Sequence, residues 1–159
     1  MAVLFRSFAQ REGMDRAPSM SRQPVICFRT PDTHEALSGL FLRLDNWDKS
    51  HRLSQELDTA EGSYWHGIAH RLEPDYGNAG YWFRRVGQHA IFPQLHAAAS
   101  SILAGQRIKW RLSERWDPFL FLRWCEEANE GGKREELAAA LAIQNVEWEL
   151  LFEWCGGRI

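Results

Sequence analysis

Helix start signals recur along this chain at short intervals, and apolar residues at helical spacing follow them. Proline or an acidic residue opens a new segment near positions 31, 58, 74, 93 and 117, and both residue types are favoured at the first positions of a helix. After the first signal, apolar residues fall on one helical face at spacing i, i+3, i+4 and i+7, as Leu37, Leu40, Phe41 and Leu44. This pattern predicts an all-α fold.

The start signals divide the chain into about seven helices. An acidic residue three positions before a glutamate predicts a capping box, here Asp32 with Glu35 and Asp58 with Glu61. Residues 106–116 alternate like a strand, but no other segment offers a strand to pair with them, so we expect a loop there. The expected helices cover residues 31–44, 47–57, 58–72, 76–86, 92–105, 117–131 and 133–155.

The length of the chain suits one domain with a core of its own. It has 159 residues, of which 45% are hydrophobic and 25% are charged. We expect a partly disordered N-terminal tail over residues 1–30. Residues 31–159 are then expected to form a single all-helical domain, in which antiparallel helical hairpins pack with the C-terminal helices.

Charge, hydropathy and cysteine usage exclude several classes of function. The formal net charge is −2, which argues against a nucleic-acid partner. No apolar run approaches the roughly 18 residues that a membrane span needs. The three cysteines lie far apart, which indicates reduced thiols in a cytoplasmic protein and neither a disulfide framework nor a C-x-x-C metal site. Exposed members of the eight tryptophans would allow a homodimer.

The stretch DYGNAGYWFRRV, which begins at Asp75, resembles the second helix of a tetratricopeptide repeat. In that motif a small residue lets two helices approach and an aromatic residue four positions later fills the groove. Here the small residue is Ala79 and the aromatic residue is Phe83. Counting back twelve residues from Ala79 leads to Gly67, the small residue expected on the first helix of the hairpin. The resemblance covers residues 33–93 and implies stacked antiparallel helix pairs.

A weaker copy of the same pattern lies 29 residues earlier, where Ser38 matches Gly67 and Ser50 matches Ala79. In this frame His66 and His70 replace two apolar residues of the first copy. Those positions face the packed interior of a hairpin, so we expect both imidazoles to be buried. A buried imidazole needs hydrogen-bond partners, because each unsatisfied group costs about 1–3 kcal/mol.

The residues around the two histidines are therefore the candidate site. The turn after the histidines and the next helix supply carboxylates, an amide, aromatic rings and arginines. We predict a ligand-binding set of His66, His70, Arg71, Glu73, Asp75, Asn78, Tyr81, Trp82, Arg84 and Arg85.

Three interpretations of this set remain open. The first is a buried polar network that fixes the register of the hairpin. The second is a pocket for a small polar or anionic ligand, in which one histidine could serve as a general base. The third is a metal site, because His66 and His70 lie four residues apart on one helical face. The H-x-x-x-H spacing is a weak signal without a third ligand, which His51 or Glu73 would have to supply, so we assign neither a metal nor another cofactor.

The block H-x-x-x-H-R-x-E-x-D-x-x-N-A-x-Y-W-F-R-R, from His66 to Arg85, resembles one shared by a family of uncharacterised microbial proteins. Residues 143–152 near the C-terminus also resemble that family, so the similarity extends over residues 35–155. No catalytic residue follows from it. We therefore expect a helical binding module for a small polar or anionic molecule or a protein partner. The alternative is a hydrolase or lyase that uses His66 or His70 as general base, with or without a metal.

Overall fold

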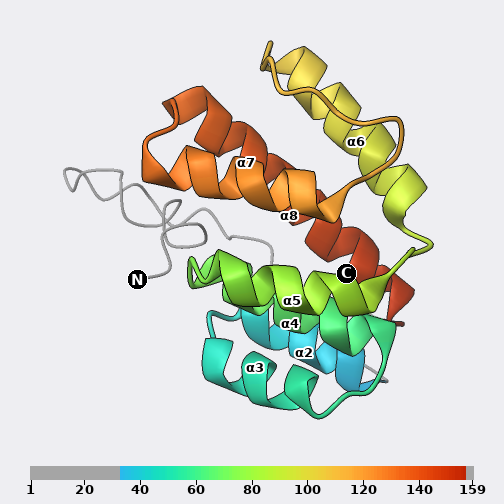
Figure 1. Cartoon of the computed structure of the whole chain (residues 1–159). Helices are drawn as coiled ribbons and strands as arrows, with labels where there is room; N and C mark the ends of the chain where they lie inside the picture. Colours follow the sequence, from blue (N-terminus) through green and yellow to red (C-terminus); the bar gives the residue numbers. More distant parts are fainter. Residues whose placement is uncertain (1–32, 157–159) are drawn as a thin grey trace, which may run out of the picture.

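The computed structural model describes residues 33–156 and contains seven α-helices and no β-strand in that range (Figure 1). The all-α prediction is confirmed. Residues 106–116, where a loop is expected, form neither helix nor strand and include one turn. The tail predicted over residues 1–30 lies outside the described residues. The helices are α2 (His34–Arg43), α3 (Trp47–Gln55), α4 (Ala60–Leu72), α5 (Tyr76–Val86), α6 (Phe92–Gly105), α7 (Pro118–Glu130) and α8 (Arg134–Trp154).

Two of the expected helix caps are shifted by one residue. Thr59 caps α4, since its hydroxyl accepts a hydrogen bond from the amide of Gly62 at 3.0 Å. The capping box predicted for Asp58 with Glu61 is therefore wrong, and the Glu61 carboxylate instead accepts a hydrogen bond from Trp154 Nε1 at 2.8 Å. A threonine next to an aspartate competes for the same role, because both side chains can accept from a free helical amide.

The same shift occurs at the start of α2, which is capped by Thr33. Asp32, the cap expected there, lies outside the described residues. Asp75 and Asp117 cap α5 and α7 as the start signals predict. The side chain of Asp75 is thereby fixed at the turn between α4 and α5, directly after the two histidines.

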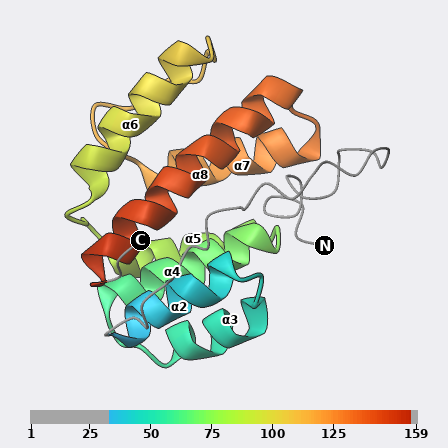
Figure 2. The ribbon, with the colours of Figure 1, turned by 180° about the vertical axis from the view of Figure 1, so that it is seen from behind.

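The helices form two groups that meet across α4, α5 and α8 (Figures 1 and 2). Helices α2 to α5 lie together in one group, and α6, α7 and α8 lie in the other. Helix α4 packs against α2, α3 and α5, and residues 62–72 of α4 are all buried. The polar side chains of α4 are therefore enclosed and must find partners within the protein.

The α4–α5 pair has the close approach that its small residues predict. A Cβ at position 67 would lie 2.9 Å from Phe83 Cε1, so only glycine leaves room for that ring. Ala79 is also fully buried. In the α2–α3 pair, Ser38 and Ser50 take the matching positions and their hydroxyl oxygens lie 2.9 Å apart. Both contacts are consistent with the predicted hairpins.

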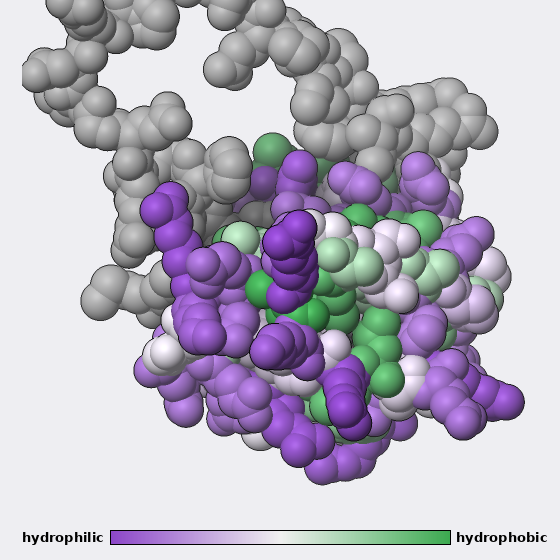
Figure 3. Space-filling model, turned by 90° about the horizontal axis from the view of Figure 1, so that it is seen from above, coloured by the Kyte–Doolittle hydropathy of each residue, from purple (hydrophilic) through white to green (hydrophobic). Residues whose placement is uncertain are grey.

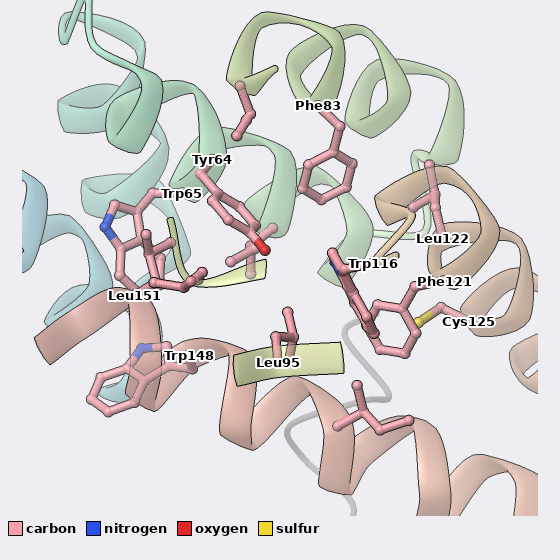
Figure 4. Packing of buried hydrophobic residues seen from close by; sticks show 14 of the residues in the cluster. Tyr64, Trp65, Phe83, Leu95, Trp116, Phe121, Leu122, Cys125, Trp148 and Leu151 are labelled. Atoms are coloured by element: carbon pink, nitrogen blue, oxygen red, sulfur yellow. The ribbon is translucent and has the colours of Figure 1, made fainter. Parts of the chain in front are cut away.

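One cluster of buried apolar side chains joins the two groups of helices. Tyr64 and Trp65 point from α4 into this cluster and Phe83 joins them from α5, while Trp148 and Leu151 come from α8 (Figure 4). The core thus lies between the α4–α5 pair and the long C-terminal helix. These core contacts fix one face of α4, and the histidines lie on the opposite face of that helix.

The surface mixes apolar and charged residues. In Figure 3, apolar side chains reach the surface near the centre of the view and polar side chains surround them. None of the helices within residues 33–156 combines the length and the apolar character that crossing a bilayer requires.

Cys125 and Cys155 are buried free thiols, and burial raises the pKa of each to about 12.

Candidate functional site

Two helical faces meet at the histidines. On α3, Trp47, Ser50, His51 and Ser54 follow the spacing i, i+3, i+4 and i+7 and so share one face. On α4, His66 and His70 are one turn apart and point towards α3. His66 is 2% exposed and His70 is 6% exposed, so the predicted burial of both rings is confirmed.

The Nε2 atoms of three histidines converge between these helices. His70 Nε2 lies 3.1 Å from His66 Nε2 and 3.3 Å from His51 Nε2. Among the described residues these three form the group of potential metal ligands whose donor atoms all lie within 4.8 Å of one another. In a tetrahedral zinc site with Zn–N bonds of roughly 2.0–2.1 Å, two ligand nitrogens lie about 3.4 Å apart. The two measured separations are close to that value.

Tryptophans enclose the imidazoles on two sides. Trp47 stacks on His51 with the ring centres 4.5 Å apart, and Trp82 of α5 covers His66 at 4.0 Å. Trp47 is itself anchored, because its Nε1 donates a hydrogen bond to the Ala69 carbonyl at 2.8 Å. These contacts fix the ring planes and limit the side chains to one arrangement.

The hydrogen bonds of Ser54 determine where the proton of His66 lies. The Ser54 hydroxyl donates to the His51 carbonyl at 3.1 Å. A hydroxyl has one hydrogen, so when Ser54 donates it to the His51 carbonyl, the 3.0 Å contact between Ser54 Oγ and His66 Nδ1 has Nδ1–H as its donor. His66 Nε2 then carries a lone pair that points into the cluster.

The Asp75 carboxylate favours the same position for the proton of His70, on Nδ1. His70 Nδ1 is buried, has no hydrogen-bond partner among the described residues, and lies 3.9 Å from Asp75 Oδ2. The other carboxylate oxygen of Asp75 accepts from the backbone amide of Asn78, which holds the group in place. A carboxylate facing Nδ1 favours a proton on that atom and a lone pair on Nε2, as in the carboxylate–histidine pairs of metal sites.

All three imidazoles are held neutral. Burial and the neighbouring rings of His51 and His70 lower the pKa of His66 to about 3. Burial is also the main cause that lowers the pKa of His70 and of His51, against the opposing effects of Asp75 and Glu73 respectively. Neutral imidazole is the form that binds a metal ion.

Arg71 lies in a different place from the histidines, although it is next to His70 in the sequence. It is buried on the side of α4 that faces α8, where its guanidinium forms an ion pair with Glu147. Arg71 Nε donates to Gln144 Oε1 at 2.9 Å, and the Tyr64 hydroxyl donates to Glu147 Oε1 at 2.9 Å. The predicted single site is thus divided into an imidazole cluster and a buried ion pair.

The other predicted residues lie at the edge of the imidazole cluster or beyond it. Trp82 and Asp75 touch the cluster, as described. Arg85 lies over the Trp82 ring at 5.4 Å and pairs with the exposed Asp58, and Tyr81 meets the same ring edge-on at 5.5 Å.

Three further members of the predicted set are exposed and do not contact the imidazole rings. The carboxylate of Glu73 is exposed and acts electrostatically on His51. Asn78 takes part through its backbone amide alone among the contacts described. Arg84 lies 6.0 Å from the centre of the Phe119 ring, away from the histidines.

The predicted set omits His51 and Ser54. The signal that could have identified them is the face of α3, which places both one turn apart beside Trp47 and Ser50. One pocket of about 370 Å³ lies elsewhere and is lined by His89, His96, Arg115 and Trp116, among others. Comparison of the chain with family models, with curated proteins and with solved structures finds no match.

Proposed function

We propose that this chain is a helical metal-binding protein in which the Nε2 atoms of His51, His66 and His70 hold one divalent transition-metal ion. The observation that carries the proposal is the convergence of these atoms: His70 Nε2 lies 3.1 Å from His66 Nε2 and 3.3 Å from His51 Nε2. One metal ion that accepts a lone pair from each imidazole would satisfy all three nitrogens at once.

The cation is the alternative to a hydrogen bond between the Nε2 atoms of His66 and His70, which depends on where each ring carries its proton. With Nδ1–H on His66 and His70, neither Nε2 atom has a hydrogen to donate. His51 has at most one Nε2–H, and His70 alone lies within hydrogen-bond distance of it. An added proton would provide the missing hydrogen, but the lowered pKa of His66 opposes that protonation at neutral pH.

The donor set indicates the class of metal. Imidazole nitrogen suits zinc, copper, nickel and iron, whereas calcium and magnesium prefer oxygen ligands. Nitrogen separations near those of a tetrahedron favour zinc among these ions. The Ser54 hydroxyl contacts His66 Nδ1 at 3.0 Å, and the Asp75 carboxylate faces His70 Nδ1 at 3.9 Å, as the groups that surround metal-binding histidines do.

The pocket for a small anion predicted from the sequence has less support. Arg71 was its strongest cation, and its guanidinium is neutralised by Glu147 on the far side of α4. The remaining arginines, Arg84 and Arg85, are exposed and directed at aromatic rings or at Asp58. A metal site uses the buried polar atoms of the cluster more fully.

The test is a titration of chelator-treated protein with zinc, followed by calorimetry. We expect one ion per chain, and a loss of affinity in His51→Gln, His66→Gln and His70→Gln that exceeds the 10–100-fold typical of residues outside the ligand shell. His34→Gln is the matched control, because His34 is an exposed histidine at the start of α2. Zinc binding that is absent, or unchanged in all three variants, would contradict the proposal.

A further inference from the structure

We infer that the metal ion at this centre keeps a coordination position for an exchangeable anionic or oxygen-donor ligand, with the exposed Glu73 carboxylate one helical turn after His70. This inference rests on the proposed metal site and specifies what the site binds. A metal with such a position can activate a water molecule or polarise the oxygen of a substrate, whereas a metal with four protein ligands only ties helices together.

The number of ligands is the first argument. Within residues 33–156, His51, His66 and His70 are the side chains grouped closely enough to share an ion. Structural zinc sites are closed by four protein ligands, and catalytic sites use three. Three ligands from two adjacent helices therefore leave part of the coordination sphere to a molecule from solution.

Access to the cluster is the second argument. His66 and His70 belong to the enclosed helix α4, so solvent does not reach the ion through that helix. His51, Trp47 and Trp82 are each only partly buried. The path to the ion therefore runs past these three rings, and a ligand arriving there would meet aromatic walls on both sides.

Glu73 is the third argument. It stands at the end of α4, one turn after His70, and its carboxylate is exposed. Among residues 33–156 this carboxylate has no hydrogen-bond or ion-pair partner, and it acts electrostatically on His51. A carboxylate one turn after His70 can accept a hydrogen bond from a metal-bound water, and its charge weakens, without preventing, the binding of an anion in place of that water.

The experiment uses the full chain loaded with cobalt(II) in place of zinc, because the visible spectrum of cobalt reports its ligands. Sodium azide is the anionic probe. We expect a saturable change in the spectrum on adding azide. In Glu73→Gln, cobalt should still bind at one ion per chain but more weakly, while azide should bind about threefold to tenfold more tightly, because removing the negative charge disfavours the cation and favours the anion.

Glu56→Gln is the matched control, since Glu56 is an exposed glutamate at the end of α3; its azide affinity should equal that of the native chain. A cobalt spectrum that azide leaves unchanged would overturn this inference and leave the metal site standing. Loss of cobalt binding in Glu73→Gln would also overturn it, because Glu73 would then be a fourth ligand. Failure of the native chain to bind cobalt would defeat both proposals.

Discussion

At the scale of single residues, the account depends on which nitrogen of each imidazole carries a proton. The Ser54 hydroxyl contacts Nδ1 of His66 at 3.0 Å, and the Asp75 carboxylate lies 3.9 Å from Nδ1 of His70, so both favour a proton on Nδ1. Neither residue would touch the metal ion. Both would act by keeping Nε2 free, which is a role for residues that surround the ligands.

Ser54→Ala should weaken zinc binding about 10-fold or more, because His66 can then place its proton on Nε2. A competition titration against a chromophoric chelator measures the change. Ser101→Ala is the control, since Ser101 is an exposed serine on α6. Equal zinc affinity in Ser54→Ala and the native chain would show that the serine does not orient the ring.

The ion pair between Arg71 and Glu147 makes a separate prediction. Glu147→Ala leaves the guanidinium buried without its partner and should lower the free energy of unfolding by about 3–5 kcal/mol. Replacing both residues, as Arg71→Met with Glu147→Leu, should recover most of that loss, because well-packed apolar side chains can replace a buried pair. Urea denaturation measures both. A single variant as stable as the native chain would contradict a structural role for the pair.

The place of Arg71 also shows where inference from the sequence ends. The repeat frame correctly predicts that His66 and His70 face inwards, because helical spacing determines the face of a residue. It does not predict the partner of Arg71, since Glu147 is 76 residues away and becomes a neighbour only when α8 packs on α4. His51 was named only as a possible third metal ligand and left out of the ligand-binding set for a related reason: the meeting of α3 with α4 is a tertiary contact.

At the scale of helices, the start signals in the sequence predict where most helices begin. Aspartate and proline mark the beginnings of α5, α6 and α7, and the apolar spacing between them gives the helices their lengths. The errors are at the caps, where Thr59 replaces Asp58. Local capping preferences of neighbouring residues differ by a fraction of a kcal/mol, so the final position depends on the surrounding packing.

Gly67 tests the packing of the α4–α5 hairpin. Alanine favours a helix by about 1 kcal/mol over glycine, yet Gly67→Ala should destabilise the protein by about 1–3 kcal/mol, because its methyl group would press on the Phe83 ring. Gly77→Ala is the control on α5, where the new Cβ would come no closer than 3.9 Å to a neighbouring atom, Asp75 Oδ1. Thermal unfolding should show opposite signs for the two changes. A stabilised Gly67→Ala variant would contradict the close approach.

At the scale of the whole molecule, the buried histidines make the metal-free protein sensitive to acid. The pKa of His66 is about 3 in the folded chain, and near 6.5 in an unfolded chain. The unfolded state therefore binds the extra proton first as the pH falls. Above about pH 6.5 the protonation of His66 does not affect the free energy of unfolding. Below that value, this free energy falls by about 1.4 kcal/mol per pH unit because of His66.

Urea denaturation of the metal-free chain at pH 7.5 and pH 5.5 measures this loss. Burial also lowers the pKa values of His51, His70 and His89, so these groups reduce stability in acid in the same way. The carboxylates of Glu73, Asp75 and Glu61 raise the pKa of His51, His70 and His89 respectively, which makes each loss smaller. His66→Gln should show a smaller loss between the two pH values than the native chain. An equal loss in both proteins would show that the His66 ring is not shielded from protons.

The most direct test of the metal site is an anomalous-difference map at the zinc absorption edge, from crystals of the chain grown with zinc. The account predicts one peak about 2.0–2.1 Å from the Nε2 atoms of His51, His66 and His70. Density without such a peak, with the three rings remaining in direct contact with one another, would contradict it.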